Sequence, residues 1–205
     1  MGLIKWLETW YKKNGNGALP RIKIQGIDNP GWGIDIDLRG TELEGQIFEL
    51  NVDNSDDDWI ICSVRDNLFT GVGDVDKLSK VIKTFKAWNE KKAADVKPPM
   101  EDDEMLYWIQ DWTKSNCDGD WEHCGGFEIK TIKSGWKVTI DISGLTPEPL
   151  PTRKMTKAGG KDNWINCSLI DEIFIGEGTA DQLGAILQVF KDWAEATYGM
   201  NEEPV

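Results

Sequence analysis

The 205-residue sequence predicts an α+β protein built from two similar units, each a curled antiparallel sheet flanked by an N-terminal and a C-terminal helix. Three observations predict this fold class. The tryptophans recur at a nearly constant interval, apolar residues follow a helical period at both ends of each unit, and they alternate with polar residues in the middle. Alternation with one polar face is typical of antiparallel sheets that are half exposed to solvent.

The repeat is most evident in the tryptophans. Ten of the eleven pair between the two halves of the chain at intervals of 102 to 105 residues, and Trp121 alone has no counterpart. The pairs are Trp6 and Trp108, Trp10 and Trp112, Trp32 and Trp136, Trp59 and Trp164, and Trp88 and Trp193. Because both copies keep these large aromatic side chains, we expect them to fill the core.

The duplication predicts a first repeat at 1–92, a linker at 93–103 and a second repeat at 104–205. Two adjacent prolines and four acidic residues in the linker segment favour an exposed connection. The first repeat carries 13 basic and 15 acidic residues, whereas the second carries 9 and 17. The second repeat is therefore the more acidic one.

Each unit begins with a predicted helix, since Ile4, Leu7, Trp10 and Tyr11 lie at helical spacing. A strand with alternating burial follows at 31–38. Further strands are expected near 47–53, 59–65 and 67–71, the last two joined by a turn at Asp66-Asn67. The equivalent strand of the second unit has its apolar residues at Trp136, Val138, Ile140 and Ile142.

A second helix closes each unit. We expect it to bury Leu78, Val81, Ile82, Phe85 and Trp88 in the first copy, and Leu183, Ile186, Leu187, Phe190 and Trp193 in the second. Asp74 is the predicted cap of the first of these helices, and Thr179 with Gln182 forms a predicted capping box for the second.

Two further motifs favour structural roles. Gly71-x-Gly73 precedes a helix but lacks the lysine and hydroxyl residue of a phosphate-binding loop, so it predicts a turn. Cys62 and Cys167 lie in equivalent strands on the apolar face and are expected to be buried, unreactive thiols.

Composition narrows the classes of function. A net charge of −13 argues against nucleic acid or an anionic membrane surface as partner. No apolar stretch is long enough to span a membrane, and the N-terminus lacks the apolar core of a signal peptide. We therefore expect a cytoplasmic protein whose thiols are reduced.

The stretch from Asn116 to Cys124 holds the one histidine, two of the four cysteines and three carboxylates. A zinc site would need four ligands, and Cys117, His123 and Cys124 supply three. A calcium site lacks most of its oxygen ligands, and a Cys–His nucleophile lacks an orienting group. A turn at Asp118-Gly119 and a protein-contact surface remain as alternatives.

Both copies resemble the immunity-53 family, small proteins proposed to neutralise toxins of bacterial polymorphic toxin systems. The resemblance rests on Asp28-Asn-Pro-Gly-Trp32, on Asp58-Trp-Ile-Ile-Cys62, on Phe69-Thr-Gly-Val-Gly73, and on Asn116-Cys-Asp-Gly-Asp-Trp-Glu-His123. The first copy departs from the last motif, having Ala18, Leu19, Pro20 and Arg21 in place of Asp120, Trp121, Glu122 and His123.

The resemblance implies inhibition of a cognate toxin by direct binding, without catalysis and without a cofactor. Many such toxins are nucleases with basic surfaces, which an acidic partner would approach rapidly. The expected contact residues are Asp118, Asp120, Trp121, Glu122 and His123. Two other classes stay open: a sulfurtransferase-like or metal-binding enzyme using the loop from Cys117 to Cys124, and a generic interaction scaffold. The acidic neighbours of Cys117 disfavour the thiolate that sulfur transfer needs.

Overall fold

The computed structural model describes residues 1–15, 19, 21–28, 30–90, 104–117, 126–146 and 150–198. In the first copy the elements are α1 (Leu3–Asn14), β1 (Ile22–Ile27), β2 (Gly31–Asp37), β3 (Phe48–Ser55), β4 (Asp58–Arg65), β5 (Leu68–Asp74) and α2 (Leu78–Asn89). In the second they are α3 (Glu104–Asn116), β6 (Gly126–Ile132), β7 (Gly135–Asp141), β8 (Arg153–Gly160), β9 (Asn163–Ile170), β10 (Ile173–Gly178) and α5 (Leu183–Tyr198).

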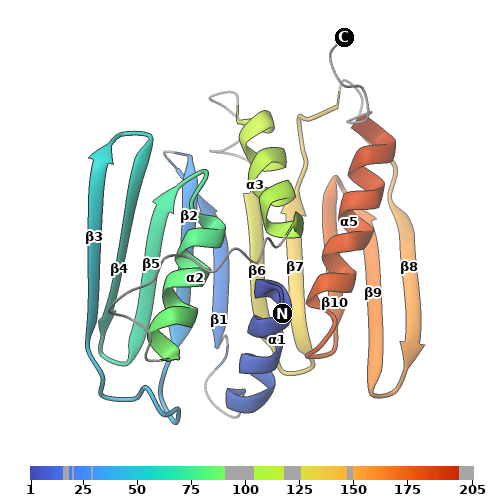
Figure 1. Cartoon of the computed structure of the whole chain (residues 1–205). Coiled ribbons are helices and arrows are strands. Elements are labelled where there is room, and N and C mark those ends of the chain that lie inside the picture. Colours follow the sequence, from blue (N-terminus) through green and yellow to red (C-terminus); the bar gives the residue numbers. More distant parts are fainter. Residues whose placement is uncertain are drawn as a thin grey trace.

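The predicted α+β class and its repetition are confirmed, and the two units join into one sheet. The ten strands are all antiparallel in the order β3-β4-β5-β2-β1-β6-β7-β10-β9-β8 (Figure 1). At the join, β1 pairs with β6, and Ile24 lies opposite Ile129. These two residues are equivalent, because Ile24 pairs with Ile34 in its own unit and Ile129 with the corresponding Val138. A pseudo-twofold axis therefore passes through the centre of the sheet.

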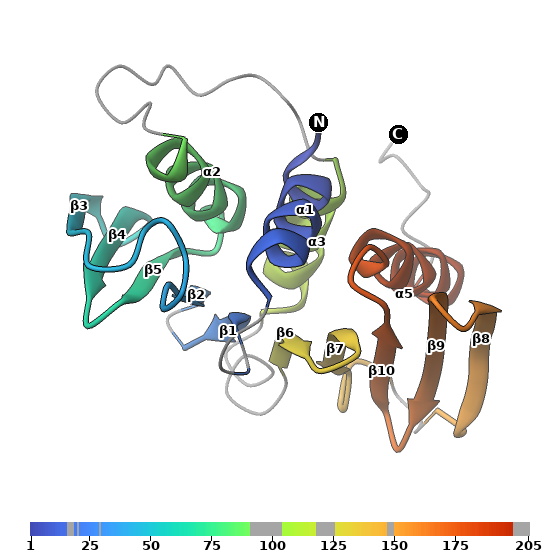
Figure 2. The same ribbon diagram turned by 90° about the horizontal axis from the view of Figure 1, so that it is seen from below.

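The helices described by the structure all lie on one face of the sheet, with α1 and α3 above the join and α2 and α5 to either side (Figure 2). The core lies between these two layers. Every apolar residue expected to be buried in α2 and α5 is buried, as are Trp32, Ile34, Ile36 and Leu38 of the first alternating segment. Of the ten paired tryptophans, Trp59, Trp108 and Trp164 are only half-buried, and the other seven are buried.

The predicted strands of the first copy agree closely with β2 to β5, whereas β1 and β6 were not predicted from the sequence. The turn at Asp66-Asn67 is confirmed, and both residues have positive φ angles (51° and 62°), as a two-residue hairpin turn requires. The prediction that Gly71-x-Gly73 forms a turn is wrong. Both glycines lie within β5, and a Cβ at Gly71 would overlap the Val81 side chain of α2. Glycine is needed there because the helix packs directly on the strand.

The predicted helix caps are also wrong. The Asp74 carboxylate accepts hydrogen bonds from the Trp59 and Asp76 N–H groups (2.9 Å each) and so holds the loop before α2. The Thr179 hydroxyl accepts from the Trp164 N–H (3.4 Å). The sequence analysis assigned the caps to residues next to the helices, because the local sequence does not show hydrogen-bond partners that lie far away along the chain.

The partners at both helix N-termini come from the opposite copy. Gln110 of α3 accepts a hydrogen bond from the Ser79 N–H in the first turn of α2 (2.8 Å) and donates one to the Asp76 carbonyl (3.2 Å). Glu8 of α1 accepts one from the Gly184 N–H in the first turn of α5 (3.1 Å). The helices of the two copies thus stabilise each other reciprocally.

Candidate functional site

The five residues predicted to contact a partner, Asp118, Asp120, Trp121, Glu122 and His123, lie outside the described residues, as does Cys124. The structure does describe the residues that precede and follow this loop. Asn116 ends α3, and its side chain donates a hydrogen bond to the Trp112 carbonyl (2.7 Å). Gly126 begins β6. The contact role of the loop remains a prediction.

Strand pairing changes how the two loops correspond. Asn14 donates to the Trp10 carbonyl (2.9 Å) as Asn116 does to Trp112, so the helix ends are equivalent. Ile22 pairs with Ile36 and Phe127 with Ile140, so the strand starts are equivalent too. Counted from the strands, Arg21 corresponds to Gly126 and not to His123. The loop of the second copy therefore contains three additional residues.

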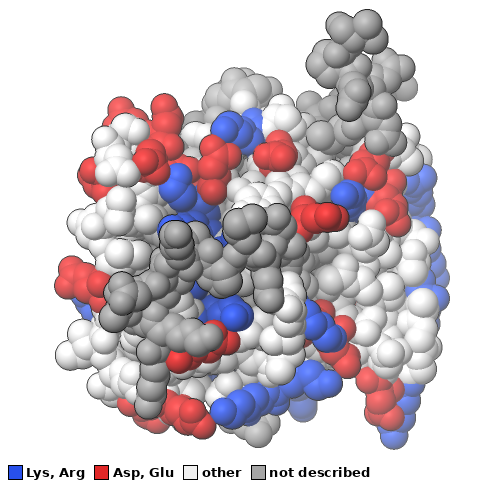
Figure 3. Space-filling view, viewed as in Figure 1, with Lys and Arg blue, Asp and Glu red and all other residues white. Residues whose placement is uncertain are grey.

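An acidic corner lies at the turn between β3 and β4, which we define as Asp53, Asp56 and Asp57. All three side chains are exposed, and none has a hydrogen bond or ion pair in the described part of the chain. Because neighbouring strands are antiparallel, this turn and the start of β6 lie at the same end of the sheet. Figure 3 shows acidic side chains gathered along this end of the molecule (red, upper left).

Basic residues near the acidic corner are held by other carboxylates. Lys77 forms ion pairs with Asp58 (3.1 Å) and Asp74 (2.7 Å), and Lys114 forms one with Asp76 (2.7 Å). The charge of the corner is therefore left available to a partner. The pseudo-symmetric turn between β8 and β9 is different, because it consists of Lys161 and Asp162, and Lys157 precedes it in β8. The two copies do not present the same surface.

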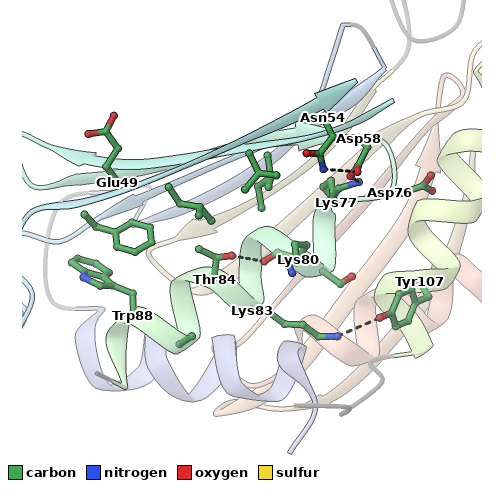
Figure 4. Close-up of a pocket in the computed structure, with 16 residues that line it drawn as sticks. Glu49, Asn54, Asp58, Asp76, Lys77, Lys80, Lys83, Thr84, Trp88 and Tyr107 are labelled. Carbon is green, nitrogen blue, oxygen red and sulfur yellow. Dashed lines mark hydrogen bonds and ion pairs between the residues drawn. The ribbon is translucent and has the colours of Figure 1, made fainter. Parts of the chain in front are cut away.

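A groove of about 750 Å³ runs between edge strand β3 and helix α2 (Figure 4). The groove forms because the edge strand β3 lies outside the strands on which α2 packs. Its apolar residues are Phe48, Leu50 and Val52 of β3, Ile60 of β4, and Ala87 and Trp88 of α2. The Phe48 and Trp88 rings lie 5.4 Å apart at one end. At the other end, Asn54 donates to the Asp58 carboxylate (2.8 Å).

Two lysines of α2, Lys80 and Lys83, line the helix side of this groove. Neither forms an ion pair within the described residues, and the Lys83 ammonium instead donates to the Tyr107 hydroxyl of α3 (3.2 Å). Glu49 points away from the helix in Figure 4. The groove therefore combines an apolar end with a charged end, where Asp58 and Asp76 lie beside Lys77, Lys80 and Lys83.

The described cysteines offer no reactive thiolate. Cys62 and Cys167 are buried, as expected, and burial raises the pKa of Cys62 to about 12 and that of Cys167 to about 11, which disfavours their thiolates. The Cys117 thiol donates to the Thr113 carbonyl (3.2 Å) at the C-terminal end of α3, where the helix dipole disfavours negative charge. In the described ranges, no three His, Cys, Asp or Glu side chains gather in a way that could hold a metal ion.

Sequence reasoning found neither the acidic corner nor the groove. The signal for the groove was present in the repeat: Lys77, Lys80 and Lys83 are spaced three residues apart, and the second copy has Gln182, Ala185 and Gln188 instead. Such a charge difference between otherwise similar helices could have indicated a functional difference. The acidic corner needed the topology, because only the strand order brings it to the same end of the sheet as β6.

No helix in the described ranges combines the length and hydrophobicity that crossing a membrane requires.

Comparisons with known proteins identify the family. No curated protein and no solved structure matches the chain. The model of one family, described as immunity protein 53, matches residues 4–90 and again residues 106–195. The two matches cover nearly all of both copies, and the chain belongs to the immunity protein 53 family.

Proposed function

We propose that the chain neutralises a cognate bacterial toxin by binding it directly, in the cytoplasm of the cell that makes the toxin. The observation that carries this proposal is the family match over both copies. In this proposal the chain blocks the toxin sterically and takes no part in chemistry.

The charge distribution supports a basic toxin surface as the target. The acidic corner lies at the end of the sheet where the loop of Asp118, Asp120, Trp121, Glu122 and His123 leaves α3 and enters β6. A basic surface, such as that of a nuclease, would be attracted to this end from a distance. Trp121 supplies a large side chain of the kind that dominates binding energy at interfaces.

Co-expression with the toxin domain encoded beside this chain tests the proposal. We expect restored bacterial growth and a complex that co-purifies. Association should slow as salt is raised, because steering by surface charge is screened. Growth arrest despite normal levels of folded chain would contradict the proposal.

Charge-removing variants locate the interface. Replacement of Asp118, Asp120 and Glu122 by alanine, or of Asp53, Asp56 and Asp57 by alanine, should each weaken toxin binding at least about tenfold with an unchanged melting temperature. The matched control replaces Lys157, Lys161 and Asp162 by alanine in the pseudo-symmetric hairpin. If the control weakens binding as much as the acidic variants, the acidic end is not the interface.

A further inference from the structure

The two edge strands of the ten-stranded sheet carry opposite charges. In the described chain β3 pairs only with β4, and β8 pairs only with β9. Residues 48–57 include four acidic side chains and no basic one, namely Glu49, Asp53, Asp56 and Asp57. Residues 152–161 include four basic side chains and no acidic one, namely Arg153, Lys154, Lys157 and Lys161. All eight side chains are exposed, and none forms an ion pair with another described residue.

These charges determine which edges can pair. A free edge offers unpaired backbone N–H and C=O groups to a strand of another molecule, and like charges along the edge oppose such pairing. Two β3 edges would bring carboxylates together, and two β8 edges would bring ammonium groups together. Pairing of like edges is therefore disfavoured, whereas β3 of one molecule and β8 of another attract each other.

The strand order permits this contact. Neighbouring strands are antiparallel throughout and the sheet has ten of them, so β3 and β8 run in opposite directions at its two ends (Figure 1). A second copy placed head to tail beside the first would continue the antiparallel alternation and keep its helices on the same face. In Figure 3 basic side chains (blue) lie along the right margin of the molecule, where β8 is.

The two edge strands also match in length and in their irregularities. Each has eight residues, and the register with its neighbour shifts once, at Asn54 in β3 and at Met155 in β8. When the two strands overlap fully, these positions coincide and Asp53 comes opposite Lys154. Both of these side chains lie on the face of the sheet away from the helices. Opposite charges at directly opposed positions stabilise an antiparallel pair of strands.

On the helix face the same overlap covers apolar surface. Leu50 and Val52 of β3 line the groove beside α2, and Val52 remains 37% exposed. In this register Ala158 of β8 comes opposite Leu50, and Thr156 comes opposite Val52. These side chains are small enough for the two backbones to approach to hydrogen-bonding distance.

We propose that copies of this chain associate head to tail, with β3 of one copy pairing with β8 of the next. Such a contact leaves one free edge of each kind, so further copies can add and the sheet continues from molecule to molecule. This association goes beyond the proposed toxin neutralisation and does not depend on it. Because the acidic corner lies at the end of β3, a bound toxin and a second copy would compete for this end of the sheet.

Net charge sets the conditions for the experiment. The chain carries a charge of −13, so whole molecules repel each other at long range. At about 0.15 M salt, exposed charges more than about 8 Å apart are largely screened, whereas ion pairs in contact across the joined edges are weakened less. Association is therefore measured at this ionic strength.

Sedimentation velocity of the full chain without toxin, over a series of concentrations, tests the proposal. We expect dimers and longer species to increase with concentration. Hydrogen–deuterium exchange should slow in β3 and β8 when a dilute solution is concentrated. Sedimentation as a monomer up to about 1 mM chain would overturn the proposal. Slower exchange in other segments without any change in β3 and β8 would also overturn it.

Charge reversal identifies the paired edges. The variant Glu49→Lys and Asp53→Lys has two basic edges, and the variant Lys154→Glu and Lys157→Glu has two acidic edges. Each variant alone should self-associate at least about tenfold more weakly than the natural chain. An equimolar mixture of the two should associate again, because every basic edge then meets an acidic edge of the other variant.

A matched control separates the edges from net charge. The variant Glu104→Lys and Asp111→Lys changes the charge of the chain as much as the basic-edge variant does, at exposed positions of α3. It should associate at least as strongly as the natural chain, and all variants should keep the natural melting temperature. Undiminished association of both edge variants, a mixture that stays monomeric, or an equal loss in the control would each contradict the proposal.

Discussion

Arg21 and Arg39 fasten the chain where it leaves β2. Arg21 is buried, and one guanidinium nitrogen donates to the carbonyl oxygens of Asp37 and Arg39 (2.7 Å each). The Arg39 guanidinium donates two hydrogen bonds to the Asp37 carboxylate, at 2.9 and 2.7 Å. These bonds lower the pKa of Asp37 below its ordinary value of 3.8 and outweigh the opposing effect of burial. Sequence could not identify this cluster, since the comparison of the two copies placed Arg21 in the loop opposite His123 and showed no contact with Asp37.

The variant Asp37→Asn should lower the free energy of unfolding by about 1–2 kcal/mol at pH 7, because the buried charged acceptor is lost. A carboxyl with a lowered pKa stabilises the fold above its unfolded pKa and stops doing so as the pH falls through its folded pKa. The difference between natural chain and variant should therefore shrink as the pH falls below about 4 and disappear only below the lowered folded pKa. Urea unfolding at several pH values measures it, and a constant difference down to pH 2 would contradict the assignment.

At the scale of the elements, helix–strand contact depends on glycine. Gly71 of β5 faces Val81 of α2, and Gly176 of β10 faces Ile186 of α5 in the same way. The sequence showed the glycines and both helices, but it did not show how closely each helix approaches its strand. Periodicity predicts only which face of an element is apolar.

The variant Gly71→Ala should lose about 1–3 kcal/mol of stability, since the added methyl group forces α2 away from the strand. Gly160→Ala is the matched control, because a Cβ at Gly160 of β8 meets no atom within 4 Å. Thermal and urea unfolding measure both variants. Equal stability of the two variants would show that α2 accommodates the methyl group.

A second property of the elements is that the first helix of each copy accepts a hydrogen bond from the N-terminal turn of the closing helix of the other copy. Gln110→Ala removes the acceptor of the Ser79 N–H, which is buried, and should lower stability by about 1 kcal/mol. Hydrogen exchange of the first turn of α2 should accelerate in this variant. Gln188→Ala on the exposed side of α5 serves as control. Unchanged exchange in α2 would mean that solvent replaces the Gln110 side chain without cost.

For the whole molecule, the repeat predicted the class of fold and most elements, but not β1 and β6, which form the join. It could not predict that the two sheets become one, because the polar residues that pair across the join, Lys23 with Lys130 and Gln25 with Glu128, have no distinctive pattern. The acidic loop could be identified from the sequence as a candidate site. The acidic corner at the same end of the sheet could be found only from the strand order.

Separate expression of residues 1–90 and 104–205 tests how far the halves depend on each other. Each half alone exposes the β1 or β6 edge and lacks the residue that caps its closing helix. We expect the two halves, when co-expressed, to co-purify as an equimolar complex, and each half alone to aggregate or self-associate through the free edge. If both halves are stable monomers that do not bind each other, this expectation is contradicted.

The pseudo-twofold axis at Ile24 and Ile129 has a consequence for how the surfaces at the two ends of the sheet can change during evolution. In a symmetric pair of identical chains every substitution occurs twice, once at each end of the sheet. In this chain a substitution at Asp56 leaves Lys161 untouched, although both occupy the same place in their hairpins. One copy can therefore acquire a new charge or a new loop while the other continues to supply its half of the sheet and the cap of its neighbour's helix.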